Sequence, residues 1–82
     1  MLHIHENFIS EGPQGYNGNV IAEFELENDN TLECIADEKL GVFWINEFQP
    51  DGFITDRKFD TSTTYDQAIE LIVKEGEKIN KE

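Results

Sequence analysis

Carboxylates are the residues of this chain whose type and spacing could carry chemistry. Glu23, Glu25 and Glu27 alternate with apolar residues, which is the pattern of a strand with one buried face. Residues two apart on a strand lie about 6.7 Å apart, which is close to two steps of about 3.4 Å along one DNA strand. We therefore expect a carboxylate row that roughly imitates phosphates and faces a basic partner. The residues expected to contact that partner are Glu23, Glu25, Glu27, Asp29, Glu33, Asp37, Glu38, Trp44 and Phe48.

The net charge of the 82 residues is −12, and it is unevenly distributed. Residues 1–56 hold twelve acids and one base, whereas residues 57–82 hold six acids and five bases. The excess acid therefore belongs to the predicted sheet. Because nucleic acids and anionic membranes are bound through basic residues, direct binding to either is disfavoured. A basic protein surface is the favoured partner, and opposite charges would speed its encounter with this chain.

Catalytic and metal-binding patterns are weak. His3 and His5 would share one face of a strand and could chelate a metal, but no third ligand follows at a suitable spacing. The glycine-rich stretch 11–19 has no lysine and no helix start after it, so it does not form a phosphate loop. Cys34 stands alone, which excludes a disulfide framework. We expect no metal, no cofactor and no enzymatic activity.

The stretch 20–37 predicts a β-hairpin with strands over 20–27 and 31–37. A three-residue loop, Asn28–Asn30, would place Leu26 opposite Leu32, with Asn30 in the left-handed conformation of a bulged turn. The same register would pair Phe24 with Cys34 and Ala22 with Ala36. It would also set Glu25 opposite Glu33, a like-charge pair that destabilises by a few tenths of a kcal/mol.

The rest of the chain predicts further strands over 2–9, 42–48 and 53–59, a loop over 11–19 and a helix over 64–80. The pairing across the turn before residue 53 would place Phe48 opposite Ile54. The expected fold is a single α+β domain, with an antiparallel sheet of four to five strands built as a meander of hairpins. One C-terminal helix would pack on one face of this sheet.

The helix begins with a capping box, in which the Thr64 hydroxyl accepts from the Gln67 N–H and Gln67 reaches back. Gly76 lies in its apolar stripe and lowers helix stability by about 1 kcal/mol relative to alanine. The spacing of Glu70–Lys74 and Glu77–Lys81 suits exposed ion pairs. The stripe expected to face the sheet comprises Tyr65, Ala68, Ile69, Ile72, Gly76 and Ile79.

The sequence leaves open which residues of the strand 42–48 lie under the helix. A two-residue Glu38–Lys39 turn would place Phe43 and Ile45 there, whereas a turn with Gly41 as a bulge residue would bury Trp44 instead. With the first turn, the uncovered face would mix acids with apolar residues, as binding faces do. Its apolar members would be Ile21, Ile35, Val42, Trp44, Phe48 and Ile54.

Two function classes follow. In size and charge the chain resembles phage-encoded anti-restriction and anti-CRISPR proteins as a class, which implies an inhibitor that mimics nucleic acid; an immunity protein against a basic nuclease would present the same surface. The alternative is a structural or accessory module that self-associates or binds a partner through an exposed aromatic sheet face, with acid serving solubility. We expect a monomer or small homo-oligomer in the cytoplasm, since no stretch resembles a signal peptide or membrane span.

Overall fold

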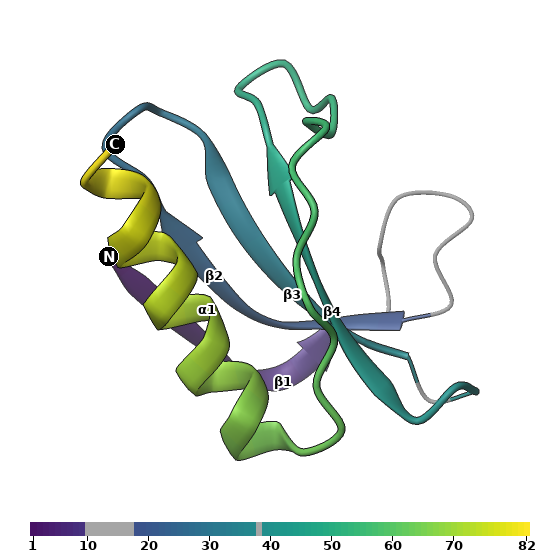
Figure 1. Cartoon of the computed structure of the whole chain (residues 1–82). Coiled ribbons are helices and arrows are strands. Elements are labelled where there is room, and N and C mark those ends of the chain that lie inside the picture. The colour runs from purple at the N-terminus through teal and green to yellow at the C-terminus, as the bar shows by residue number, and fades with distance from the viewer. Residues whose placement is uncertain (10–17, 38) are drawn as a thin grey trace.

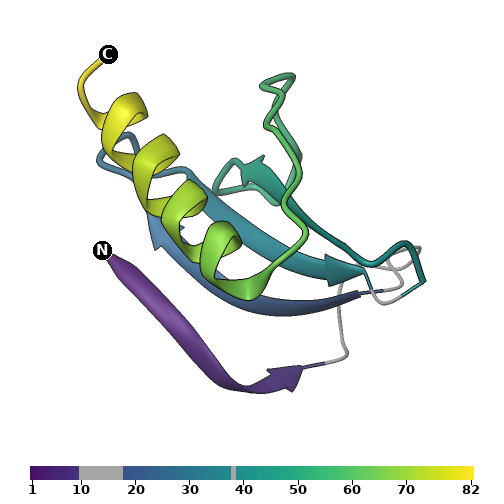
Figure 2. The ribbon, with the colours of Figure 1, turned by 60° about the horizontal axis from the view of Figure 1, so that its bottom comes forward.

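A computed structural model describes residues 1–9, 18–37 and 39–82, with backbone alone for residues 5–9, 18 and 19. Four strands form one antiparallel sheet in the order β1-β2-β3-β4. The single helix of the described chain, α1, follows them and lies on one face of the sheet (Figures 1 and 2). The α+β expectation is confirmed. The elements are β1 (Leu2–Ile9), β2 (Gly18–Glu25), β3 (Thr31–Asp37), β4 (Val42–Phe48) and α1 (Tyr65–Asn80).

From Ala22 onward the β2–β3 hairpin has the predicted faces, but its register differs from the predicted one. Phe24 lies opposite Leu32 and Glu23 opposite Glu33. The loop still has three residues, but it begins one residue earlier, because the Leu26 N–H donates to the Asn30 carbonyl at 2.9 Å. Asp29, and not Asn30, is therefore the left-handed residue, with φ of 72°. The resulting slip of two residues preserves which side chains share a face.

The β3–β4 register places Phe43 and Ile45 on the helix side of the sheet, opposite Ala36 and Cys34. Trp44 therefore lies on the other face, and of the two alternatives left open by the sequence, the one that would bury Trp44 under the helix does not occur. The connection spans residues 38–41 rather than two residues, and Gly41 has φ of 68°. Relative to the two-residue turn, this turn shifts the strand register by two residues. Because the shift is even, the same side chains of β4 face the helix.

The core lies between α1 and the sheet. Apolar side chains of β2, β3 and β4 meet Ala68, Ile72 and Ile79 of α1. Burying this apolar area, at about 25 cal/mol per Å², is what holds α1 on the sheet. In the apolar stripe predicted for α1, Tyr65 is exposed and Ile69 only half-buried, since both lie at the margin of the helix face that packs on the sheet. The Thr64 hydroxyl caps the helix as predicted, but Gln67 Oε1 accepts from the Thr63 hydroxyl and does not reach back.

A bulge in β2 changes the expected outer surface. Ala22 lies opposite Cys34 but Val20 lies opposite Ile35, so Ile21 is the extra residue on β2. Ile21 is fully buried in the core beside the helix instead of lying on the uncovered face. Ile35 does lie on that face but is only 2% exposed. Both were expected to be accessible, and neither is.

The predicted fifth strand over 53–59 is not formed. Only one bridge of the expected pairing is present, Phe48 opposite Ile54. The chain then bows away from β4 and returns to it at a second bridge, Phe43 opposite Ser62 (Figure 1). Most of the predicted loop over 11–19 lies outside the described residues, and residues 18 and 19 belong to β2.

Candidate protein-binding face

The outer face is the surface of the sheet opposite α1. Strand pairing arranges its side chains in rows across the sheet. One row runs from His3 through Glu23 and Glu33 to Asn46. The next row contains Glu25, Thr31, Phe48 and Ile54. The acids therefore occupy β2 and β3, whereas the large apolar side chains occupy β4 and the turn after it.

The most exposed acids of this region lie at the end of the β2–β3 hairpin. Glu25, Glu27 and Asp29 are all exposed, and their carboxylates can meet a partner directly. Glu23 and Glu33 are half-buried, and both interact with other groups of the chain. Because β2 ends at Glu25, the regular strand spacing joins only Glu23 and Glu25. Glu27 belongs to the turn, where its N–H donates to Asn80 Oδ1 at 2.9 Å.

Asp37 helps to form the turn between β3 and β4. Its Oδ1 accepts hydrogen bonds from the N–H groups of Lys39 at 3.0 Å and Leu40 at 3.1 Å. The side chain is half-buried, so less of its charge is accessible than was expected. Glu38, also predicted to contact a partner, lies outside the described residues.

Apolar side chains border the acids along β4. Trp44 is 39% exposed, and Phe48 is half-buried. In the turn after β4, Ile54 lies opposite Phe48 and is 44% exposed, and the neighbouring Phe53 is 71% exposed. Sequence reasoning did not place Phe53 among the binding residues, because it assigned the residue to a fifth strand. The available signal was its position directly after the turn sequence Pro50-Asp51-Gly52, which puts it at a tip.

A buried carboxylate on the helix side was also missed. Glu47 is 2% exposed, and its Oε2 accepts from Asn30 Nδ2 at 2.7 Å. Its Oε1 accepts from Arg57 Nε at 2.7 Å and from the Thr55 hydroxyl at 3.2 Å. Burial raises the pKa of Glu47, but these hydrogen bonds and the Arg57 charge outweigh it and hold the pKa below its ordinary value. The alternation of β4 placed Glu47 among apolar residues and was the signal for this cluster.

The hydrogen-bonded group of Glu47, Asn30, Thr55 and Arg57 is called the Glu47 cluster, and Arg57 extends it to Glu82. Its two terminal nitrogens donate to the two carboxylate oxygens of Glu82, each at 2.9 Å. The hydrogen bonds that Arg57 donates to Glu82 and Glu47 raise its pKa, so it stays charged. The Glu47 cluster thus joins the β2–β3 turn, β4, the segment after β4 and residue 82. Its groups are saturated with partners, and its role is structural.

The two histidines were considered as metal ligands, and the structure describes the side chain of one of them, His3. His3 Nε2 lies 3.6 Å from Glu25 Oε1, in the acidic part of the outer face. The side chain of His5 lies outside the description. No three described His, Cys, Asp or Glu residues are grouped to hold a metal ion.

Comparisons with protein-family models, with curated proteins and with solved structures found no match for this chain. Within the described residues, no helix combines the length and the apolar character needed to cross a membrane.

Proposed function

We propose that this protein is a non-enzymatic, acidic binding protein that occupies a basic, nucleic-acid-binding surface of a partner protein and thereby inhibits it. The observation that carries the proposal is the division of the outer face. Exposed carboxylates gather at the β2–β3 end, and exposed apolar side chains lie beside them along β4 and the following turn.

This division matches what a protein partner requires. Interfaces combine apolar anchors at their centre with a charged rim that sets orientation. Trp44 and Phe53 are large enough to act as anchors, and Glu25, Glu27 and Asp29 supply the charge. A solvated acidic face would need no apolar residues beside it. The pairing of both kinds on one side therefore favours binding over solubility alone.

Electrostatics favours a partner that normally holds phosphate. Surfaces that bind nucleic acids use Arg and Lys to contact phosphate oxygens, and carboxylates offer the same groups the same kind of acceptor. The regular strand spacing covers only Glu23 and Glu25, and the acids then follow the turn through Glu27 and Asp29. The proposed mimicry rests on clustered charge rather than on a regular repeat of phosphate positions.

The test is capture from a bacterial lysate with the immobilised full chain at low salt and at about 0.5 M salt, where the Debye length is short. We expect a nucleic-acid-binding enzyme that is retained at low salt, released at high salt and displaced by added DNA or RNA. The variant Glu25→Lys/Glu27→Lys should retain at least tenfold less of it. The control Asp60→Lys/Asp66→Lys makes the same charge change at exposed positions away from the outer face and should retain it.

A partner that is indifferent to salt or not displaced by nucleic acid would overturn the proposal. Equal losses in both variants would do so as well, since net charge alone would then explain binding. The exposure of Trp44, Phe53 and Ile54 supports a second candidate, an accessory module that docks through this apolar edge. That module would bind its partner at high salt and would lose it on Trp44→Ala or Phe53→Ala.

A further inference from the structure

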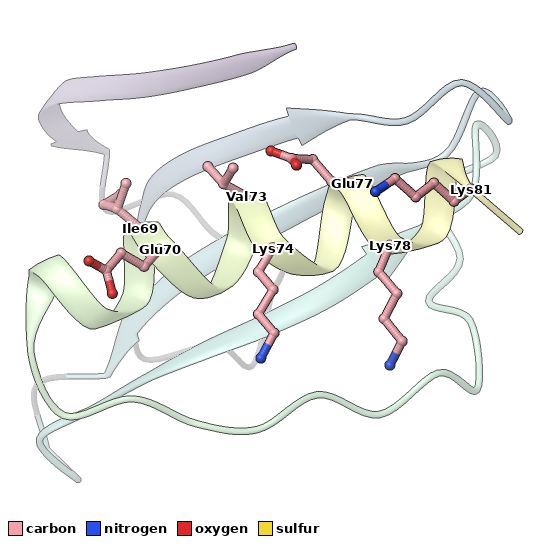
Figure 3. Close-up of a pocket in the computed structure, with 7 residues that line it drawn as sticks. All are labelled: Ile69, Glu70, Val73, Lys74, Glu77, Lys78 and Lys81. Carbon is pink, nitrogen blue, oxygen red and sulfur yellow. The ribbon is translucent and has the colours of Figure 1, made fainter.

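The exposed side of α1 carries a stripe of alternating charge. Glu70, Lys74, Glu77 and Lys81 are all exposed. At about 100° per residue they fall within a sector about 60° wide. We call these four residues the helix stripe. An open groove of about 740 Å³ runs along it, with Ile69 and Val73 at one margin and the exposed Lys78 at the other (Figure 3).

The charges of the helix stripe are not neutralised within the described chain. The spacing of Glu70–Lys74 and Glu77–Lys81 predicts ion pairs along the helix, but neither pair comes within 4 Å. The ion pairs of the described residues involve His3, Arg57 and their partners instead. Lys74 extends toward one side of α1, while Glu77 extends toward the other (Figure 3). The helix stripe is therefore available to a partner that offers the complementary order of charges.

The charges of the helix stripe are complementary to those of a second copy of the same helix that runs in the opposite direction. The signs run minus, plus, minus, plus, and the intervals between the residues are four, three and four positions. A second copy of α1 running antiparallel, with a two-fold axis between residues 75 and 76, would place Glu70 opposite Lys81. The same axis places Lys74 opposite Glu77. Since a two-fold axis repeats each contact, four oppositely charged pairs form at once.

A parallel copy in the same register would place each charge opposite its like. The order of the charges therefore favours a second copy of α1 as the partner and favours its antiparallel orientation over the parallel one. Ile69 and Val73 are half-buried and lie beside the helix stripe, so the second copy would cover apolar area in addition to charge.

We propose that this chain forms a weak antiparallel homodimer through the helix stripe. The repulsion expected for a chain of net charge −12 is smallest here, because the acid-rich part of the chain forms the sheet. The two outer faces would then point away from each other, with both helices between the sheets (Figure 2). The dimer would present two acidic faces to its surroundings, and it does not depend on the function proposed for them.

Sedimentation equilibrium of the full chain at low ionic strength tests the proposal. The mass should rise from 9.5 kDa toward twice that value with concentration. Exposed ion pairs are individually weak, so we expect a Kd of about 0.1–1 mM that weakens severalfold in about 0.5 M salt. Glu70→Lys/Glu77→Lys gives an all-positive helix stripe, and Lys74→Glu/Lys81→Glu an all-negative one. Each variant alone should be monomeric, and an equimolar mixture should form a heterodimer at least tenfold more tightly than either variant self-associates.

The net charge of the all-positive variant is closer to zero, so general repulsion would predict more association rather than less. The control Asp56→Lys/Asp60→Lys makes the same charge change at exposed sites and should still dimerise. A wild-type chain that stays at 9.5 kDa throughout would overturn the proposal. So would a dimer that persists in both stripe variants, or a mixture that stays monomeric.

Discussion

Gly76→Ala tests the packing of α1 on the sheet, because two opposing effects of known size meet at this residue. In an exposed helix interior, alanine is about 0.8–1 kcal/mol more favourable than glycine. Gly76 is buried, however, and a Cβ at this position would lie 2.5 Å from Phe24 Cδ1 and Cε1 and 2.8 Å from Cγ. The three contacts lie on one ring face that is itself only 8% exposed, so neither the ring nor the helix can move freely. Overpacking of this kind costs about 1–3 kcal/mol.

The cost exceeds the gain over most of these ranges, so we expect Gly76→Ala to lower the free energy of unfolding by about 1 kcal/mol. This corresponds to a fall in Tm of about 4–8 °C for a domain of this size. Urea unfolding followed by far-UV circular dichroism would measure it.

The clash predicts a specific rescue. In a Phe24→Leu background the ring is absent, and Gly76→Ala should then stabilise the chain by up to about 1 kcal/mol, as helix propensity alone requires. The double-mutant cycle should give a coupling energy of about 1–3 kcal/mol. If Gly76→Ala stabilised the wild-type chain by the full propensity difference, the close approach of α1 to β2 would be wrong.

Three further predictions concern the Glu47 cluster, the Cys34 thiol and the helix cap at Thr64. Because the folded state holds the pKa of Glu47 below its ordinary 4.5, Glu47 contributes stability above that pH and loses it as the pH falls through the folded pKa. Glu47→Gln should therefore cost about 1–3 kcal/mol at pH 7 and flatten the loss of stability below pH 4.5 in urea titrations. Burial raises the pKa of Cys34 to about 12, so its reaction with a thiol reagent at about pH 8 should require unfolding and accelerate with urea; rapid labelling of the native chain would contradict its burial. Thr64→Ala removes the hydroxyl that accepts from the Gln67 N–H and should cost about 1 kcal/mol in thermal unfolding, with Thr63→Ala, one residue outside the cap, as the milder control.

Alternation along β2 and β3 predicted most of their residues that face the helix, with Ile21 at the bulge as an exception. Phe24, Leu26 and Cys34 were assigned to one face, and all three are in the core. Both hairpins differ from the predicted ones, yet the strand register of each differs by two residues. Since side chains alternate with a period of two, even errors in register leave the faces intact.

The exact register depended on contacts between distant residues. Both Asn28–Asn30 and Glu27–Asp29 are plausible three-residue loops from composition alone. In the structure, the Asn30 side chain donates to Glu47, which lies 17 positions away, and Asn28 Oδ1 accepts from the Asn30 N–H. These bonds favour the loop that begins one residue earlier. The bulge at Ile21 and the bowed segment after β4 also depend on tertiary packing, and no local sequence pattern predicts them.

The sequence predicted which residues form the outer face better than it predicted which of them are accessible. Glu25, Glu27 and Trp44 are exposed as expected, whereas Ile35 is buried on the same side of the sheet. Burial depends on what covers each row, and alternation carries no information about that. The apolar part was underestimated for the same reason, since Phe53 was placed in a strand that does not form.

Some of the described acids hold the fold together through hydrogen bonds, whereas others do not. Binding can therefore be tested at the second kind without changing the stability of the fold. The carboxylates of Asp37, Glu47 and Asp51 accept hydrogen bonds that hold turns or the Glu47 cluster. Within the described residues, the carboxylates of Glu27 and Asp29 take part in no hydrogen bond or ion pair. Part of the charge on which the fold does not depend thus lies at one end of the outer face, where sequence rules for stability would not require it. Replacing Glu27 with lysine should change binding and leave the unfolding free energy within about 0.5 kcal/mol, as for ordinary surface substitutions. If the lysine variant unfolded instead, the Glu27 carboxylate would have a structural role and the argument for a binding face would lose its main support.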